Sequence, residues 1–592
     1  MGKEMYRSVP RKVEDLLRDV ENGRIGLPDL QRQFVWKDNK VRDLLDSMIK
    51  GFPIGYLILW SSPEDYENTK TIGKNDKAYS RPDDLVIDGQ QRLTSLLAAI
   101  LGLKVKDVNF KERNIRICFN PLTRAFEVWS QAYGKDPLWI SDISEVFAAN
   151  KEHTLAKYRR AYIANLNASR EKKGNEPLTD DEEIEIEENL NALLNLMDYT
   201  IPTLQITTIA SEEEVSDIFK RVNSGGQKLN ENNFIETLLA VYDTDIYDKI
   251  HQFCIDSRIP KDGTPYNHII EVNPQNLIRM AVGFGFKRAR LKYAYMLLRG
   301  RNLDTGETSA EERESNMTKF KDALEVVTNL NNWHAFLNLF SEAGYYNSNM
   351  VSSTYVVIYG YVLYLLGKYN CKVPSVELNK LITKWLFMSS ITAYYSSSPE
   401  STVEKQFADL RDETTAEGFT AYINNAISTK FTDDYFNVTL PSSLNSSSAN
   451  SPAWFGYIAS VNVLGTPMWL SNTLLSKHLV VGSSGTKASV DKHHIFPKNY
   501  LATIDISDDR DRNQIANFTY LDYVTNIDIA DNPPADYVDR YKAKLGAENF
   551  KISCENNAIP EGFETMSYFE FLAARRVLMS GIVKKAYQHL AE

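Results

Sequence analysis

The stretch that decides the fold of the N-terminal region reads DLVIDGQQRLTSLLAAI, from Asp84 to Ile100. Its first part, residues 85–87, is a short, apolar and largely β-branched run that predicts a strand ending on Asp88. Gly89 supplies a turn, and the leucines after it repeat at helical spacing. The polar run of the motif is therefore expected at the mouth of a helix: Asp88, Gln90, Gln91 and Arg92.

The mouth of a helix is a natural site for an anion. Unpaired backbone N–H groups and the positive end of the helix dipole attract phosphate, and a guanidinium can hold a phosphate through two hydrogen bonds. We therefore interpret this stretch as a nucleotide site. The alternative is that Asp88 only caps the helix and that the three polar residues after Gly89 are solvated first-turn residues.

Three motifs resemble, in the same order, the GmrSD family of modification-dependent (type IV) restriction systems. They are GLPDLQRQFVW at residues 26–36, DGQQR at residues 88–92 and IFKRVNSGGQKLN at residues 218–230. The resemblance implies a ParB/sulfiredoxin-like domain over residues 1–240 that binds and hydrolyses a nucleotide. The nucleotide-binding residues that it implies are Gln31, Arg32, Asp88, Gly89, Gln90, Gln91, Arg92, Arg221 and Asn223.

The resemblance also implies catalytic roles in the DGQQR motif. Asp88 would position a metal or water, Gln91 with Gln90 would orient the attacking water, and Arg92 would take up phosphate charge. The chain has no Walker A string, so the usual phosphate loop of NTPases is not expected. ATP, GTP, CTP and UTP all remain open as the nucleotide. Without the resemblance, the pair at 31–32 is better explained as surface residues and the pair at 221 and 223 as an ordinary helix end.

Composition indicates a multidomain globular protein. The chain has 592 residues, of which 43% are hydrophobic and 24% charged, and its net charge is −11. This charge argues against a surface covered by nucleic acid but leaves room for a local basic groove. Four separated cysteines and the charged N-terminus favour a reduced, cytoplasmic setting. The longest apolar run, Tyr355 to Leu366, is too short to span a bilayer, so no membrane is expected and the run predicts a buried helix.

Taken along the chain, the pattern predicts an α+β multidomain fold. Residues 241–440 show long helical periodicity, residues 441–454 form a polar linker, and residues 455–592 form a separate module. One segment of the helical region concentrates basic residues and is a candidate DNA contact, or else an ordinary basic helix face: Lys287, Arg288, Arg290 and Lys292. The terminal helix over residues 567–590 carries further cations that would contact phosphates or only close the domain.

The C-terminal module contains a second chemical motif, SVDKHHIFPKNYL, at residues 489–501, with Asn517 and Asn526 downstream. It resembles the His-Asn-His (HNH) nuclease domain of the same family, built as a ββα-metal finger. The resemblance makes His494 the general base, His493 and Asn526 the metal ligands, and Asn517 a structural residue. Many relatives carry an acid at the position of His493, so both Mg²⁺ and Mn²⁺ remain open, and Asp491 is a fallback ligand.

These expectations combine into one function. The chain is expected to be a nucleotide-regulated, metal-dependent endonuclease of a type IV restriction or anti-phage system. Its substrate would be double-stranded, modified phage DNA, for example with hydroxymethylated or glucosylated cytosine. A homodimer is expected because cutting both strands needs two HNH sites. Two alternatives remain: a ParB-like, nucleotide-switched DNA clamp with an inactive nuclease domain, and an unspecific nicking nuclease or RNase that causes abortive infection.

Overall fold

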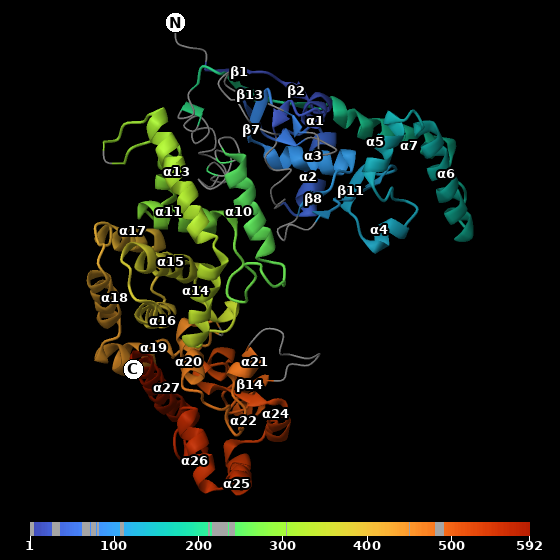
Figure 1. Cartoon of the computed structure of the whole chain (residues 1–592). Coiled ribbons are helices and arrows are strands. Elements are labelled where there is room, and N and C mark those ends of the chain that lie inside the picture. Colours follow the sequence, from blue (N-terminus) through green and yellow to red (C-terminus); the bar gives the residue numbers. More distant parts are fainter. Residues whose placement is uncertain are drawn as a thin grey trace. The chain divides into compact units, whose positions relative to one another are not determined.

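The computed structural model describes most of the chain. The described residues are 5–26, 36–61, 71–72, 78–79, 82–106, 112–210, 214–215, 235, 239, 243–303, 305–448, 450–479 and 490–592. They form two compact units, Met1–Asp248 and Lys249–Glu592. Both units are drawn in Figure 1. Strands and helices mix in the first unit and helices dominate the second, so the predicted α+β class is confirmed.

A five-stranded sheet forms the centre of the first unit, in the order β1-β13-β4-β7-β3. Its middle pairs are parallel between β13 and β4 and antiparallel between β4 and β7. The predicted strand before Gly89 is β7, which lies next to the edge strand β3. The strands are β1 Tyr6–Ser8, β3 Ile25–Gly26, β4 Leu57–Ser61, β7 Asp84–Asp88 and β13 Thr203–Ile206. The remaining strands of this unit form short two-stranded pairs: β2 Arg11–Lys12 with β12 Thr200–Ile201, β5 Thr71–Ile72 with β6 Ala78–Tyr79, β8 Val105–Lys106 with β9 Glu112–Arg113, and β10 Ile117–Asn120 with β11 Ala125–Val128.

The sheet separates two apolar clusters. Strand side chains alternate between faces, so Leu57 and Leu59 of β4 belong to the large core while Ile58 and Trp60 belong to a smaller one. The large core includes the apolar faces of three helices that Figure 1 shows beside the strands: α1 Val13–Glu21, α2 Asp38–Ile49 and α3 Gln90–Leu101. Burial of these faces fixes α3, and with it the polar residues at its first turn.

Further helices extend the first unit beyond the sheet. The predicted capping box at Thr179 and Glu182 is present and starts α7. Its two reciprocal hydrogen bonds satisfy backbone donors that a helix start would otherwise leave open. These elements are α4 Gln131–Lys135, α5 Ile143–Lys151, α6 Leu155–Lys172, α7 Asp180–Leu194 and a 3-10 turn, η2 Asn195–Asp198.

The second unit is built mainly of packed helices. Its most buried helix is α15, Thr354–Leu365, which is the helix predicted from the apolar run at Tyr355 to Leu366. It contacts α11, α14 and α16 (Figure 1). The helices of this part are α10 Thr244–Asp256, α11 Pro274–Phe286, α12 Leu291–Leu298, α13 Ala310–Val327, α14 Leu330–Glu342, α16 Ser375–Ile391, α17 Pro399–Asp409 and α18 Ala416–Lys430, with a 3-10 turn η4 Ser348–Met350 and the π-helical turns η5 Leu366–Asn370 and η6 Tyr435–Thr439.

The segment predicted as a polar linker differs from that expectation. Residues Leu440–Ser443 form a short helix, α19, and Pro452–Val463 form α20, both of which contact α27. Leu440 and Leu444 are fully buried, and the carbonyl oxygen of Ser446 accepts a hydrogen bond of 2.8 Å from the backbone of Ile515. The segment is therefore packed, and the predicted helical domain and C-terminal module lie in one compact unit.

The end of the chain contains a β-β-α arrangement. Strand β14, Val490–His494, pairs antiparallel with β15, Phe518–Asp522, and α24, Tyr523–Ile529, follows directly. A long helix, α27 Tyr568–Ala591, matches the predicted terminal helix and contacts α16, α19 and α20. The other elements here are α21 Ser476–Leu479, α22 Lys498–Thr503, α23 Asp509–Arg512, η7 Ile515–Asn517, α25 Pro534–Leu545, α26 Ala547–Asn556 and η8 Phe563–Thr565.

Within the described ranges, no helix combines the length and the apolar character that crossing a bilayer requires.

Candidate functional site

The DGQQR motif lies at the junction between the end of β7 and the start of α3. Gly89 adopts φ +93°, a left-handed conformation that favours glycine, and the helix begins at Gln90. A Cβ atom on Gly89 would lie 2.7 Å from the Leu57 side chain, so the turn also needs the missing side chain for space. The local structure thus agrees with the strand, turn and helix predicted from the sequence.

Arg92 is tied into the fold at this turn. Its Nη1 donates a 2.7 Å hydrogen bond to the carbonyl of Ile54, and its Nη2 lies 3.3 Å from Oδ2 of Asp88. Gly55, at φ +90°, passes so close that a Cβ atom there would lie 2.4 Å from Nη1. Burial lowers the pKa of Arg92, while the charge of Asp88 opposes this shift. The guanidinium is therefore a half-buried bridge between the motif and the loop before β4.

The two glutamines of the motif differ in their contacts. Nε2 of Gln90 donates to the carbonyl of Val86 at 2.9 Å, and the backbone carbonyl of Gln91 accepts from Ser95 Oγ at 2.6 Å. Both side chains are half-buried at the first turn of α3. The structure thus brings five of the predicted nucleotide residues together, Asp88 to Arg92. The other four, Gln31, Arg32, Arg221 and Asn223, lie outside the described residues.

A second site lies at the end of β14. A pocket of about 410 Å³ opens here between β14, α22 and α24. Its volume is within the range that small ligands occupy in proteins. The backbone of Ala530 has a positive φ of 48°, which strains a residue other than glycine and is often seen at functional sites. The lining residues are Lys492, His493, His494, Pro497, Lys498, Asn499, Asn526, Ala530 and Asp531.

His494 is held in one orientation. Its Nε2 lies 3.2 Å from Oδ1 of Asn513, and its ring packs edge-on against Phe518 with centroids 4.6 Å apart. Because an amide oxygen only accepts, this contact places the proton on Nε2 and leaves the lone pair on Nδ1. Burial lowers the pKa of His494 to about 4. The ring is therefore neutral near pH 7 and can accept a proton through Nδ1.

His493 and Asn526 contact each other in the same pocket. Nδ1 of His493 lies 2.7 Å from Oδ1 of Asn526, although the two residues are 33 positions apart in sequence. In this arrangement Nδ1 donates to the amide oxygen. The same two atoms are close enough to serve as neighbouring ligands of one cation when the imidazole takes the other tautomer and Nδ1 carries the lone pair. An imidazole nitrogen and an amide oxygen suit a divalent ion of borderline hardness. The donor set therefore fits a divalent metal, although no group of three His, Cys, Asp or Glu ligands occurs among the described residues. The side chain of Asp491, the fallback ligand, is outside the described structure.

Asn517 supports the chain beside His494. Its Oδ1 accepts from the backbone N–H of Phe496 and its Nδ2 donates to the carbonyl of Phe496, both at 2.9 Å. The Asn517 side chain is fully buried, and its backbone carbonyl accepts from Ile495 at 2.8 Å. These bonds fasten the residues directly after the two histidines to the start of β15.

Three residues of this pocket region were not singled out from the sequence. They are Asn513, which orients His494, and the two lysines of the pocket, Lys492 and Lys498. Asn513 precedes a turn with no periodic pattern, so nothing in the sequence marks it. The lysines flank the His-His pair at close spacing in the sequence, so their place near the pocket could have been predicted.

The predicted basic segment is partly used inside the fold. Lys287 donates to the carbonyls of Leu410 and Arg411 at 2.9 and 2.6 Å. Arg288 lies 3.2 Å from Glu404. These two side chains therefore hold the segment against the region of α17. Arg290 lies 3.4 Å from Ser401 Oγ, and Lys292 is exposed. A DNA contact by these two residues stays a prediction.

Three cations of the terminal helix are likewise used inside the fold. Arg575 is fully buried, so a phosphate contact by this residue is excluded. Arg576 donates to Asn445 Oδ1 at 3.2 Å, and Lys584 pairs with Asp433 at 2.7 Å. The terminal helix therefore mainly closes the unit.

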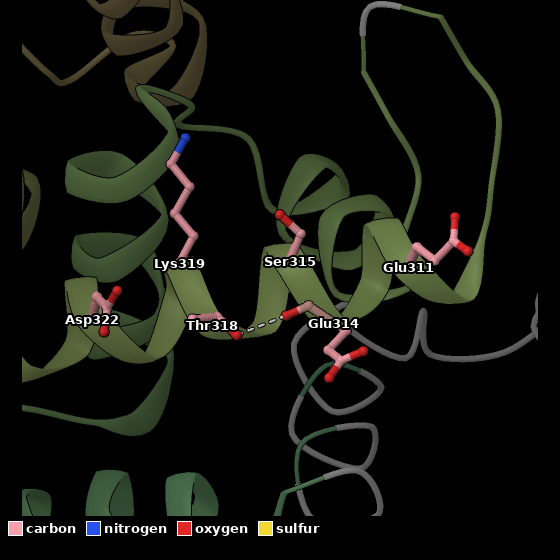
Figure 2. A pocket seen from close by; sticks show the side chains of 6 residues that line it. All are labelled: Glu311, Glu314, Ser315, Thr318, Lys319 and Asp322. Carbon is pink, nitrogen blue, oxygen red and sulfur yellow. Dashed lines mark hydrogen bonds between the residues drawn. The ribbon is translucent and has the colours of Figure 1, made fainter.

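A different hollow, of about 400 Å³, runs along α13. Figure 2 shows the side chains that line it, all of which leave this one helix. Three are acidic and one is basic, and Thr318 Oγ1 donates to the carbonyl of Glu314 at 2.9 Å. A hollow with this charge would repel phosphate, so it is not a candidate nucleic acid site. Its lining residues are Glu311, Glu314, Ser315, Thr318, Lys319 and Asp322.

Comparisons with known proteins agree with the N-terminal motifs. Residues 13–240 match the family model of the GmrSD restriction endonuclease N-terminal domain. This segment is therefore similar to the N-terminal domain of the GmrSD restriction endonuclease family. The chain is also 29% identical over 247 residues to an uncharacterised protein of Methanocaldococcus jannaschii, over 36% of this chain and 39% of that relative. The chain thus spans well under half the length of this curated relative, and residues after 240 lie outside the family match.

Proposed function

We propose that the protein is a metal-dependent DNA endonuclease of a type IV restriction system, with its nuclease centre in the pocket at the end of β14. The observation that carries this proposal is the convergence of His493, His494 and Asn526 in one pocket. A neutral imidazole with its lone pair exposed to a pocket can take the proton of an attacking water. The match of residues 13–240 to the family model of the GmrSD N-terminal domain supports the assignment to restriction.

The geometry supports separate roles for the residues of the pocket. Nδ1 of His494 accepts the proton of the water, while Asn513 keeps the opposite nitrogen protonated and the ring in place. His493 and Asn526 would hold one divalent ion. That ion, when bound, supplies positive charge to the phosphorane-like transition state and to the leaving oxygen. Mg²⁺ and Mn²⁺ both remain candidates, because the described ligands are neutral.

The N-terminal unit supplies nucleotide hydrolysis in this proposal. Asp88 positions the attacking water or a metal, Gln90 and Gln91 orient the water, and Arg92 stabilises phosphate charge. The half-buried Arg92 can stabilise charge from a fixed position, as catalytic guanidiniums require. Turnover of ATP, GTP, CTP or UTP would regulate cleavage, so that host DNA is spared. The substrate would be modified phage DNA, cut by a homodimer whose two pockets take one strand each.

The first experiment compares plasmids that differ only in cytosine modification. Plain, hydroxymethylated and glucosylated DNA are incubated with Mg²⁺ or Mn²⁺, with and without each nucleotide. The wild-type protein is compared with His494→Ala and with His589→Ala, a control at an exposed position of the terminal helix. We expect selective cleavage of modified DNA that His494→Ala abolishes and His589→Ala preserves. Cleavage unaffected by His494→Ala would contradict the nuclease centre.

The nucleotide site is tested separately, by phosphate release from each nucleotide. Asp88→Ala is expected to abolish turnover with an unchanged circular dichroism spectrum. Asp83→Ala is the matched control, because Asp83 directly precedes β7 and is exposed. Normal turnover by Asp88→Ala would remove this residue from the site. Turnover without cleavage of any DNA would favour a nucleotide-switched DNA clamp.

A further inference from the structure

Two lysines of the nuclease pocket have no role in the reaction derived above. Lys492 precedes the two histidines on β14, and Lys498 begins α22 after Pro497. Both line the pocket together with His493 and His494. They reach it from two different elements, β14 and the first turn of α22.

Lys492 is held over aromatic rings. Its Nζ lies 3.7 Å from the ring centroid of Phe518 and 5.7 Å from that of Trp454. Such contacts stabilise a cation without neutralising it. The same Phe518 ring packs against His494, so the ammonium and the predicted base share one support.

Neither ammonium group is neutralised by a carboxylate. In the described part of the chain, Lys492 and Lys498 form no ion pair, although many other lysines and arginines of this acidic protein do. Among the described residues that line the pocket, one is acidic, Asp531, and its Oδ2 accepts a 2.8 Å hydrogen bond from Asn499. Two lysines against one aspartate give these lining residues a positive balance.

Both lysines line the pocket together with His494, and Lys492 and His494 contact the same Phe518 ring. An anion that contacts both lysines would lie beside His494.

We propose that Lys492 and Lys498 form a phosphate clamp that holds the nucleic acid backbone on either side of the bond to be cut. The clamp rests on the proposed nuclease function and names the part of the substrate that the pocket binds. The lysine ammonium group is a point charge that can donate to a phosphate oxygen from many directions, so the clamp is independent of base sequence. Specificity for modified DNA would then arise elsewhere in the protein.

The test measures binding and not cleavage. A short fluorescein-labelled DNA duplex is titrated with full-length protein in EDTA, and the anisotropy yields the affinity over a series of salt concentrations. For B-DNA, log K falls against log salt with a slope of about −0.9 per phosphate neutralised. We expect Lys492→Gln and Lys498→Gln each to reduce the steepness of this slope by about 0.9, and the double variant by about twice that amount. Lys492→Arg and Lys498→Arg should retain the wild-type slope.

A control separates a clamp from a change in net charge. Lys551→Gln removes the same charge from α26, where the ammonium lies 3.9 Å from Glu555 and outside the pocket. The clamp predicts no change of slope in this variant. Equal slopes in all glutamine variants and the wild type, or no DNA binding by the wild type, would overturn the clamp.

The clamp and the nuclease can fail independently. If the wild type cleaves DNA through His494 but the lysine variants keep the full salt slope, the clamp is wrong and the nuclease stands. If the slopes fall as expected but no metal supports cleavage, the pocket binds backbone phosphates without cutting them. In that case the clamp stands and the nuclease assignment falls.

Discussion

Asn517 is bound to the backbone of Phe496 by two hydrogen bonds of 2.9 Å, one in each direction. The side chain is fully buried and lies at the start of β15, whereas Phe496 follows the two histidines of β14. The pair therefore sets the path of the chain that leaves His494. A buried amide with all its partners inside the protein cannot be removed without leaving those partners unsatisfied.

Asn517→Ala is accordingly expected to destabilise the second unit. An unsatisfied buried polar group costs about 1–3 kcal/mol, and two backbone groups of Phe496 lose their partner here. We expect a loss of about 2–4 kcal/mol in the free energy of unfolding, measured by urea denaturation. Asn549→Ala is the control, because its exposed side chain donates only to the carbonyl of Leu545. A change below 0.5 kcal/mol in Asn517→Ala, within the usual range for surface substitutions, would show that the pair does not hold this loop.

Asn513 should affect catalysis more than stability. Its Oδ1 contacts Nε2 of His494, whereas its Nδ2 donates to the carbonyl of Asp509 in a part-exposed turn. Asn513→Ala leaves the imidazole free to change tautomer and to rotate, so fewer molecules present Nδ1 to the water. We expect kcat for DNA cleavage to fall by about 10-fold to 100-fold, with little change in KM. A variant that raises KM alone would indicate that Asn513 contacts the substrate.

Much of the fold and part of the site could be predicted from the sequence. The apolar run before Asp88 and the leucine spacing after Gly89 predict β7 and α3, because local periodicity determines both elements. The capping box at Thr179 is equally local. The packing around residues 441–454 was missed, because the serine-rich composition hid the buried Leu444 inside the segment and Leu440 directly before it.

The parts of the site that could not be predicted depend on contacts between residues far apart in the sequence. The hydrogen bond of Arg92 to the carbonyl of Ile54 depends on how β4 and β7 align, and no spacing in the sequence reports it. The same is true of the contact between His494 and Asn513. The cations of the terminal helix were predicted either to contact phosphates or only to close the domain, and Arg575 is fully buried in the core. Side chains whose role depends on pairing between distant segments are thus the ones that sequence patterns conceal.

Gly55 should be needed for the nucleotide site because of Arg92. A Cβ atom at Gly55 would lie 2.4 Å from Nη1 of Arg92, so Gly55→Ala must displace the guanidinium from the carbonyl of Ile54. We expect nucleotide turnover to fall to the level of Arg92→Ala, measured by phosphate release. Gly51→Ala is a close control. Gly51 has a similar φ of +70° but no atom within 4 Å of the added carbon, so it reports backbone strain of about 1 kcal/mol without the clash.

Equal loss of nucleotide turnover in Gly51→Ala and Gly55→Ala would contradict this prediction. Strain in the loop would then be sufficient to explain the effect, and displacement of Arg92 would not be required. Equal thermal stability of the two variants together with selective loss of turnover in Gly55→Ala is the expected outcome.

The buried thiols should react slowly in the native protein and in a way that depends on pH. Burial raises the pKa of Cys118 and of Cys554 to about 11. The thiolate is the reactive form, so at pH 8 only about one thiol in a thousand is ionised. We expect iodoacetamide labelling at both positions to be slow at pH 8 and to become fast in urea, measured by mass spectrometry of peptides.

The same shifts affect stability at high pH. A thiol that keeps its proton in the folded state and loses it in the unfolded state lowers the free energy of unfolding as pH rises from 9 towards 11. Below pH 9 both states are protonated and the thiols have no effect. Cys118→Ser and Cys554→Ser should therefore flatten the alkaline loss of stability, and an unchanged alkaline limb would contradict the assignment.

Arg575 is the residue whose replacement should disturb the second unit most. It is fully buried on α27, and its Nη1 donates to the carbonyls of Ala516 and Phe518 at 2.7 and 2.8 Å. These carbonyls flank Asn517. Burial lowers the pKa of Arg575. A charged group buried on backbone carbonyls is costly unless its donors are satisfied, so the guanidinium and the start of β15 depend on each other.

Arg575→Met removes the charge at similar length and leaves both carbonyls without a donor. We expect a loss of about 3–5 kcal/mol in the free energy of unfolding, measured by urea denaturation, together with loss of DNA cleavage. Arg575→Lys retains one cationic donor and should recover part of both. Arg576→Met, at the next position of the same helix, removes a part-exposed guanidinium bound to Asn445 and should cost less than 1 kcal/mol. If Arg575→Met were as stable as Arg576→Met, the hydrogen bonds to Ala516 and Phe518 would not hold β15, and the support of the nuclease pocket would have to come from Asn517 alone.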